Sequence, residues 1–194
     1  MSLDEAIQRL KKILPEHLDE FQKVLEKLPN GIEQWLYSPK IKDLINLYQG
    51  DIVRDIATCY INKDGKTVYG SDTVALISNS CDMVPGRRDF IIVSPIISVE
   101  NYIENAKKLK INPDDTIYQV RKNQILRYFY LPPKGNLEES FIDFSRMVTI
   151  SSSYLNNIKN ENPENFIVSL SSHGHYFFLL KLNYHLSRTE DITE

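Results

Sequence analysis

Residues 50–70 read GDIVRDIATCYINKDGKTVYG, and this stretch decides the fold class. Its first half is rich in β-branched residues, which favour strands, and Asp64 followed by Gly65 is typical of a tight hairpin turn. More short β-rich segments follow along the chain: TVALIS (73–78), DFIIVSPII (89–97), ILRYFYLP (125–132) and SFIDFSRMVTI (140–150). Five or six short strands separated by turns predict a small, mostly antiparallel, partly closed barrel or a sandwich.

Helical patterns flank these strands, so the predicted fold class is α+β, mainly β with flanking helices. From Ser2 to about Tyr48 apolar residues recur at helical spacing, and a break at Ser38 and Pro39 indicates shorter pieces near the end. This helical extension, residues 1–48, should pack on the barrel because Trp35, Leu36 and Tyr37 need burial close to the first strand.

The remaining segments complete the predicted organisation. Residues 49–155 form the barrel, with a helical insertion near residues 99–122. Residues 156–194 form an Asn-rich linker, from 156 to 165, followed by a C-terminal helix within SLSSHGHYFFLLKLNYHLSR (169–188). Ser171 or Ser172 would cap that helix, and a strand is the alternative because aromatic residues are common there too.

Composition narrows the function classes and the compartment. A net charge of −3 over 194 residues argues against a strongly basic nucleic-acid binder, so any such function has to rest on a local patch. Cys59 and Cys81 form no CxxC pair and are too few for a disulfide framework, which favours a reducing compartment. The chain shows no signal-peptide pattern and no apolar run of membrane-spanning length, so we expect a cytoplasmic protein that does not contact membranes.

The order of four segments carries a family resemblance. GDIV opening the barrel, VALIS as a central strand, IIVSPIIS as the next and FIDFSRMVTIS running into a short helix together resemble the MazF/PemK family of toxin endoribonucleases, over roughly residues 50–155. The resemblance implies an SH3-like barrel, single-stranded RNA as partner, and RNA cleavage without metal or cofactor.

That family uses an arginine just before the central strand and a threonine or serine after the Pro-Ile of the next strand. Here the residues before VALIS, 70–73, contain no arginine, and Ser98 matches the hydroxyl position only in part. Cleavage through the RNA 2′-hydroxyl places charge on phosphate oxygens, which a guanidinium stabilises well. The resemblance therefore implies RNA binding with weak or lost ribonuclease activity.

Seven residues are the candidates for such a site. Asp82, Ser98 and Arg146 are the candidate catalytic residues, with Asp82 orienting an arginine or accepting a proton. The candidate RNA-binding residues, which could supply the missing cation, are Asn79, Arg87, Arg88 and Arg127. We expect these residues to gather on one surface around the ends of VALIS and IIVSPIIS.

Other interpretations remain open at this level. Cys81, beside Asp82, is either a nucleophile or a small residue in a turn. His173 and His175 form an HxH pair that binds one ion well only if extended, so we expect no metal site. The aromatic run RYFY (127–130) either stacks bases or packs in the core. The alternative function is a protein-interaction module of a toxin–antitoxin or defence-type system, and a Cys- or metal-dependent enzyme is less favoured. The partner would then be another protein or a second copy of the chain.

Overall fold

The computed structural model describes residues 31–39 and 46–187. The helices expected before residue 31 and within 40–45 lie outside these residues. The described elements, in chain order, are α3 (Ile32–Trp35), β1 (Ile52–Ile61), β2 (Thr67–Leu76), β3 (Phe90–Ser98), α4 (Val99–Lys108), α5 (Asp114–Arg121), β4 (Tyr128–Leu131), β5 (Ser140–Asp143), the 3-10 turn η2 (Phe144–Arg146), β6 (Val148–Ser151), α6 (Ser152–Glu161), the 3-10 turn η3 (Pro163–Asn165), β7 (Phe166–Val168) and α7 (Ser172–Ser187).

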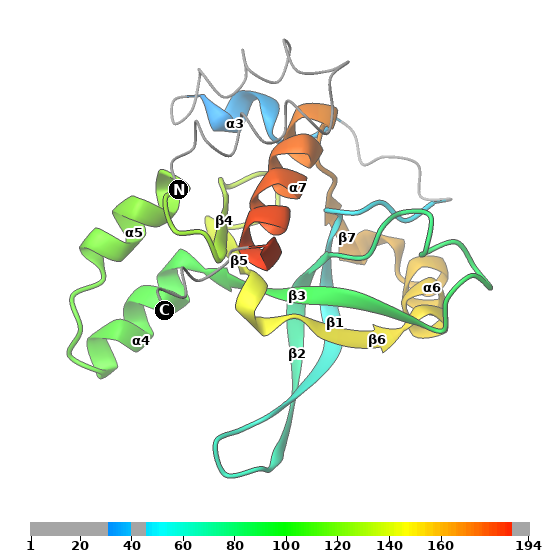
Figure 1. Ribbon diagram of the computed structural model, residues 1–194, viewed down its shortest axis with the longest axis horizontal. Coiled ribbons are helices and arrows are strands. Elements are labelled where there is room, and N and C mark those ends of the chain that lie inside the picture. The colour runs from blue at the N-terminus through cyan, green and yellow to red at the C-terminus, as the bar shows by residue number, and fades with distance from the viewer. Residues whose placement is uncertain (1–30, 40–45, 188–194) are drawn as a thin grey trace, which may run out of the picture.

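The strands form one curled sheet in which all pairings are antiparallel, so the predicted α+β class and antiparallel sheet are confirmed. The strand order is β4-β5-β3-β2-β1-β7, and β6 pairs with β3 beside β5. No pairing in the described residues joins β4 to β7, so the curl stays partial. Figure 1 shows α7 across one side of the sheet, α4 and α5 at one end of β3, and α6 at the other.

The predicted hairpin is confirmed, although its second strand is longer than expected. Asn62 closes the turn: its side-chain oxygen accepts from the backbone N–H groups of Asp64 and Lys66, and Gly65 adopts a positive φ of 72°. β2 then continues to Leu76, so TVYG and VAL, expected in separate strands, belong to one strand.

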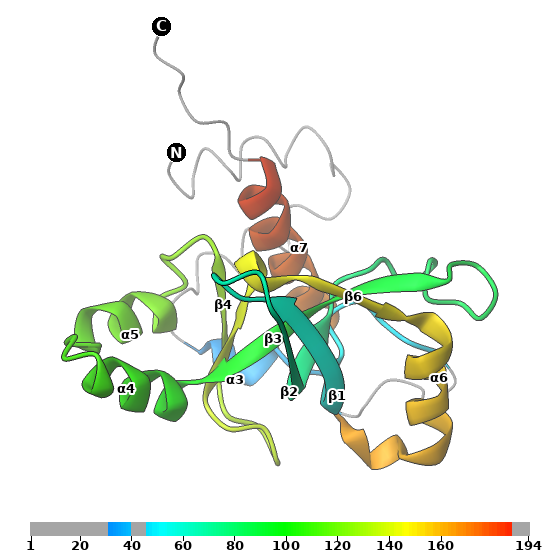
Figure 2. The same ribbon diagram turned by 90° about the horizontal axis from the view of Figure 1, so that it is seen from below.

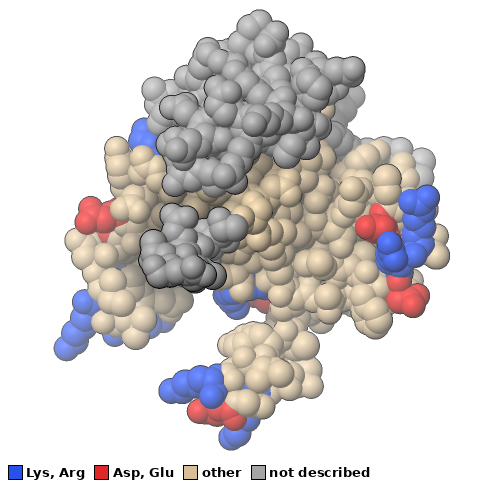
Figure 3. Space-filling view, viewed as in Figure 1, with Lys and Arg blue, Asp and Glu red and all other residues tan. Residues whose placement is uncertain are grey.

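The outer part of this hairpin projects from the sheet as a two-stranded ribbon, which we define as residues 56–61 and 67–72. The register of β1 shifts between Val53 and Ile56, and Asp55 has a φ of 58°, which identifies a bulge that bends the strand. Figure 1 shows the ribbon leaving the body, Figure 2 views it nearly end-on, and Figure 3 shows its charged tip standing clear of the remaining surface.

Two sequence predictions on the later strands are wrong. Residues 140–150 do not form a single strand, because β3 pairs with β5 near one end and with β6 near the other, and η2 makes the crossing between them. Residues 156–165 are not a linker but form most of α6 and η3. Ser151 caps α6, and Leu155 on its inner side is fully buried. Asn157 and Asn160 lie on the solvated face of that helix, whereas Asn165 is buried in η3.

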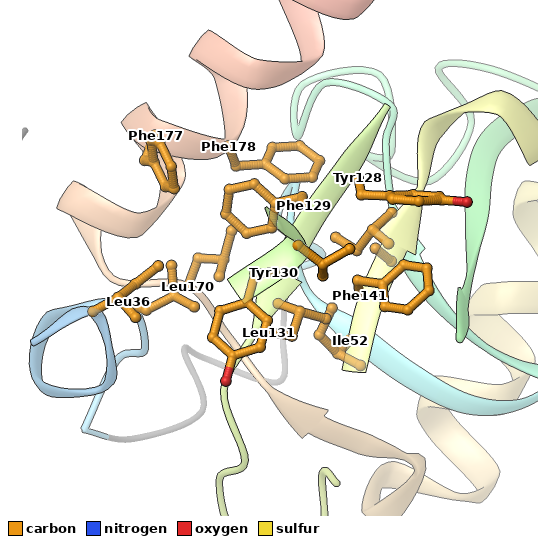
Figure 4. Close-up of a cluster of buried hydrophobic side chains, with 14 of the residues drawn as sticks. Leu36, Ile52, Tyr128, Phe129, Tyr130, Leu131, Phe141, Leu170, Phe177 and Phe178 are labelled. Carbon is orange, nitrogen blue, oxygen red and sulfur yellow. The ribbon is translucent and has the colours of Figure 1, made fainter. Parts of the chain in front are cut away.

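The C-terminal helix α7 is confirmed, and it supplies much of the core. The Ser171 side-chain oxygen accepts from the Gly174 N–H at 2.9 Å, so Ser171 is the cap. Figure 4 shows Phe177 and Phe178 reaching the buried ring of Phe129 on β4, and their ring centroids lie 5.3 and 5.5 Å from it. The helix thus packs against the sheet through buried aromatic side chains.

Residues 31–39 belong to the same core, as expected from Trp35, Leu36 and Tyr37. Leu36 and Tyr37 are buried, and Trp35 packs edge-on against Phe177 with ring centroids 6.0 Å apart. The Tyr37 hydroxyl donates to the carbonyl oxygen of Pro132 at 2.7 Å.

None of the helices within residues 31–39 and 46–187 combines the length and the apolar character that a membrane span needs.

A buried lysine on α7 makes stability depend on pH. Lys181 is 6 % exposed, and its ammonium donates at 2.8 Å to the carbonyl oxygens of Asn123 and Ile125, between α5 and β4. Burial lowers its pKa from 10.5 to about 7. The unfolded chain therefore binds more protons between pH 7 and pH 10.5, and stability rises with pH across that window.

We expect the unfolding free energy to increase by about 2 kcal/mol from pH 7 to pH 9 because of this residue. Urea unfolding at the two pH values measures the increase. In Lys181→Met the same comparison should give a nearly flat profile; an unchanged pH dependence in that variant would assign the effect to another group.

Candidate nucleic-acid interface

Four of the predicted site residues lie in the loop between β2 and β3. The Asn79 side-chain oxygen accepts from the Cys81 N–H at 3.0 Å, and its carbonyl oxygen accepts from the Asp82 N–H at 2.9 Å, so Asn79 organises a turn. Asp82 pairs with Arg88 at 3.2 Å, and Arg87 donates to the Cys81 carbonyl oxygen at 3.5 Å. The ion pair is largely exposed, so it stabilises the loop weakly.

The cysteine and histidine alternatives gain no support from their surroundings. Cys81 is exposed within this turn. His173 and His175 lie in the first turn of α7, and the His175 Nε2 atom is 3.2 Å from the Gln49 side-chain oxygen. Residues 31–39 and 46–187 contain no group of three His, Cys, Asp or Glu side chains that could hold a metal ion.

Ser98 lies at the opposite end of β3 from that loop. Its hydroxyl oxygen caps α4 by accepting from the Asn101 N–H at 3.1 Å. The loop returns to the sheet at Phe90, eight residues before Ser98, and a strand of that length spans about 26 Å. The hydroxyl is engaged in helix capping and lies far from Asp82.

Arg127 and Arg146 lie at a third location, near the point where β5 passes into η2. The Phe144 N–H donates to the Arg127 carbonyl oxygen at 2.9 Å, so Arg127 lies beside the residue two positions before Arg146. Arg127 stacks on the Tyr128 ring, 4.4 Å from its centroid, and hydrogen-bonds to the Tyr128 hydroxyl. Arg146 lies over the Tyr60 ring of the ribbon, with its guanidinium carbon 5.8 Å from the centroid.

The structure therefore does not gather the predicted residues on one surface. β2 and β3 are antiparallel, so the segments VALIS and IIVSPIIS end at opposite ends of β3. The loop with Asp82 follows the first of these ends, and Ser98 stands at the second. Arg146 emerges between the β3 positions Val93 and Ile96, because β6 pairs with the former and β5 with the latter.

Two exposed tyrosines of the ribbon were not among the predicted site residues. Tyr60 is 51 % exposed and Tyr69 is 81 % exposed. The sequence signal was the placement of large side chains on both strands close to a predicted turn, where no third strand was available to bury them. In contrast, Tyr128, Phe129 and Tyr130 of the aromatic run are buried, which confirms that they pack in the core.

The Tyr128 phenol is the hydrogen-bond partner of the Arg127 guanidinium. Burial raises the pKa of Tyr128 above its usual value, and the hydrogen bond from Arg127 opposes that rise. Tyr128 therefore stays a neutral phenol at neutral pH. Arg127 and Arg146 are both exposed. We call Tyr60, Arg127 and Arg146 the arginine corner.

Comparison with known proteins adds no assignment, because no family model and no curated protein sequence matches this chain.

Proposed function

We propose that this protein binds single-stranded RNA at the arginine corner, and that it is a diverged relative of the MazF/PemK endoribonucleases on an SH3-like barrel. The observation that carries the proposal is the placement of the Arg146 guanidinium over the half-exposed ring of Tyr60. Arg127 adds a second cation, and its carbonyl oxygen accepts from the N–H of Phe144, two residues before Arg146.

The chemistry of these groups suits a flexible nucleic-acid strand. Arginine side chains present planar forks of N–H donors that match phosphate oxygens. Exposed aromatic rings offer stacking surfaces for bases, and stacking of this kind tolerates any base sequence. A single strand can place a phosphate on Arg127 or Arg146 while an adjacent base reaches Tyr60, whereas the bases of a duplex are already stacked on one another.

The position of Ser98 supports binding without efficient cleavage. A general acid or base has to lie within hydrogen-bond reach of the proton that it transfers. Ser98 is four residues along β3 from Ser94, whose hydroxyl donates to the Asp143 carbonyl oxygen just before η2. This spacing corresponds to about 13 Å along the strand, too far for Ser98 to act with Arg146 on one phosphate.

Binding through this corner should weaken with salt. Two phosphate contacts on single-stranded RNA give a log–log slope of about −1.4, so affinity should fall about sevenfold when salt rises from about 50 to about 200 mM. Fluorescence anisotropy with a labelled single-stranded oligoribonucleotide measures this slope, and the same sample analysed on a gel reports cleavage.

Each outcome of that titration is informative. Salt-sensitive binding with intact RNA supports the proposal. Rapid cutting in the presence of a chelator would show that the catalytic route survives, and variants Ser98→Ala and Arg146→Ala would then identify its residues. Binding that is absent at low salt would refute the proposal and favour the protein-interaction alternative.

A further inference from the structure

The ribbon carries an open β-sheet edge on β2. β3 pairs with β2 only at Val74, Ala75 and Leu76. From Thr67 to Asp72 the only strand beside β2, within the described residues, is β1. An unpaired edge of this length is a template for another strand, and proteins that do not use such an edge usually cover it or interrupt it.

Along each strand of the hairpin, backbone N–H and C=O groups point alternately toward the partner strand and away from it. One contact of β1 shows which residues point outward. The Ala57 N–H donates to the Tyr154 hydroxyl on α6 at 3.0 Å, so it points away from β2. In an antiparallel pair the residue opposite points its own N–H and C=O outward as well, and the pattern repeats at every second residue. The residues of β2 that face the open edge are therefore Ser71, Tyr69 and Thr67.

We propose that a second copy of this chain pairs with this edge, antiparallel, about a two-fold axis through Tyr69. In that register Tyr69 lies opposite the partner's Tyr69, and Thr67 lies opposite the partner's Ser71. Lys66 lies opposite the partner's Asp72, and the two-fold axis repeats each contact. The proposal concerns assembly and does not depend on RNA binding.

Charge complementarity selects both the second copy and the register. Lys66 and the partner's Asp72 form a non-hydrogen-bonded pair, in which opposite side chains approach most closely. Sliding the strands by two residues in one direction places Asp64 opposite the partner's Asp72, which sets two carboxylates against each other. Sliding them in the other direction places Lys66 opposite the partner's Val74, where β3 already occupies the edge.

The paired strands also bring together exposed apolar surface. Tyr69 is 81 % exposed, and Ile61 and Cys59, on the same face of β1, are exposed too. Pairing would form about six backbone hydrogen bonds and set the two Tyr69 rings side by side across the axis. An interface of this size is smaller than that of an obligate dimer, so the association should be reversible.

The opposite edge of the ribbon is less open. There the Tyr154 hydroxyl already accepts the outward N–H of Ala57, and β7 pairs with Ile52 and Val53, so of the outward-facing ribbon residues of β1 only Cys59 and Ile61 are left. Since a two-fold contact uses the same patch on both copies, pairing closes at two chains. The expected assembly is a dimer rather than a filament.

A disulfide trap tests the register directly. In a background of Cys59→Ser and Cys81→Ser, the variant Tyr69→Cys places two thiols on opposite sides of the axis, with Cα atoms about 5.5 Å apart. The matched control, Thr67→Cys, places its two thiols about 13 Å apart in the same dimer. Mild oxidation should give a covalent dimer with Tyr69→Cys and none with Thr67→Cys. Equal cross-linking of both variants, or of neither, would overturn the proposal.

A charge swap tests the selecting contact in solution. Sedimentation velocity should show a concentration-dependent dimer, and Lys66→Asp should weaken it at least about tenfold, because like charges then face each other twice. Combining Lys66→Asp with Asp72→Lys should restore dimerisation. Lys63→Asp makes the same charge change outside the paired segment and should leave the dimer unchanged. A monomer at all concentrations, or a double variant as weak as Lys66→Asp, would contradict the proposed edge.

Discussion

A Gly174→Ala variant should lose about 3 kcal/mol or more of unfolding free energy, the largest effect that we expect from a single methyl group in this protein. A Cβ atom at this position would lie 2.0 Å from the carbonyl oxygen of Leu36. That oxygen belongs to the backbone and accepts from the Ser171 N–H at 2.9 Å, so it cannot rotate away. The first turn of α7 would have to separate from residues 31–39, which weakens the cap and the packing around Trp35.

Urea unfolding followed by circular dichroism measures this loss. Gly70→Ala is the matched control, because its Cβ would meet only the side-chain oxygens of Asp72 and Thr58, both at 3.9 Å. We expect the control to stay within about 1 kcal/mol of the parent protein. If both variants unfold at the same urea concentration as the parent, the contact between α7 and Leu36 is not as close as described.

The second large effect concerns RNA. Replacing both Arg127 and Arg146 by alanine should lower the affinity for single-stranded RNA about thirtyfold at low salt, since each lost charge-assisted contact removes about 1 kcal/mol. The salt dependence should nearly disappear at the same time, because no phosphate contact then remains at the corner. Anisotropy titrations of the parent protein and the variant at two salt concentrations measure both effects.

The loop between β2 and β3 offers a control with the same change of charge. Arg87→Ala combined with Arg88→Ala removes two exposed arginines, one of which pairs with Asp82. At 0.1 M salt, charges separated by more than the Debye length of about 10 Å are largely screened, so in a titration at that salt the control should change affinity less than about threefold. A loss as large as that of the Arg127 and Arg146 variant would move the RNA-binding surface to the loop between β2 and β3.

The elements that could be predicted from the sequence are those fixed by local contacts. The hairpin turn depends on Asn62 and Gly65, and α7 begins at Ser171, so a short window of sequence contains the determinants of each. The break between β5 and β6 could not be predicted from a short window of sequence. It arises because β3 accepts two partners in succession, and that choice depends on pairing between distant segments.

In the candidate site, too, local contacts could be predicted from the sequence and long-range contacts could not. Asp82 and Arg88 are six residues apart, and their ion pair forms within one loop. Arg146 and Tyr60 are far apart in sequence, and their contact forms only in the folded chain, where the bulge at Asp55 bends the ribbon. The ends of strands that follow one another in the sequence lie on opposite sides of the sheet when the strands pair antiparallel.

Photocrosslinking tests the RNA-binding surface most directly. A single-stranded oligoribonucleotide carrying 4-thiouridine is bound to the protein at low salt and irradiated, and the modified peptides are identified by mass spectrometry. We expect the main adduct on the peptide containing Tyr60, and we expect it to disappear in the variant lacking Arg127 and Arg146. An adduct confined to the loop of Asn79, Asp82, Arg87 and Arg88, or adducts unchanged by that variant, would contradict this expectation.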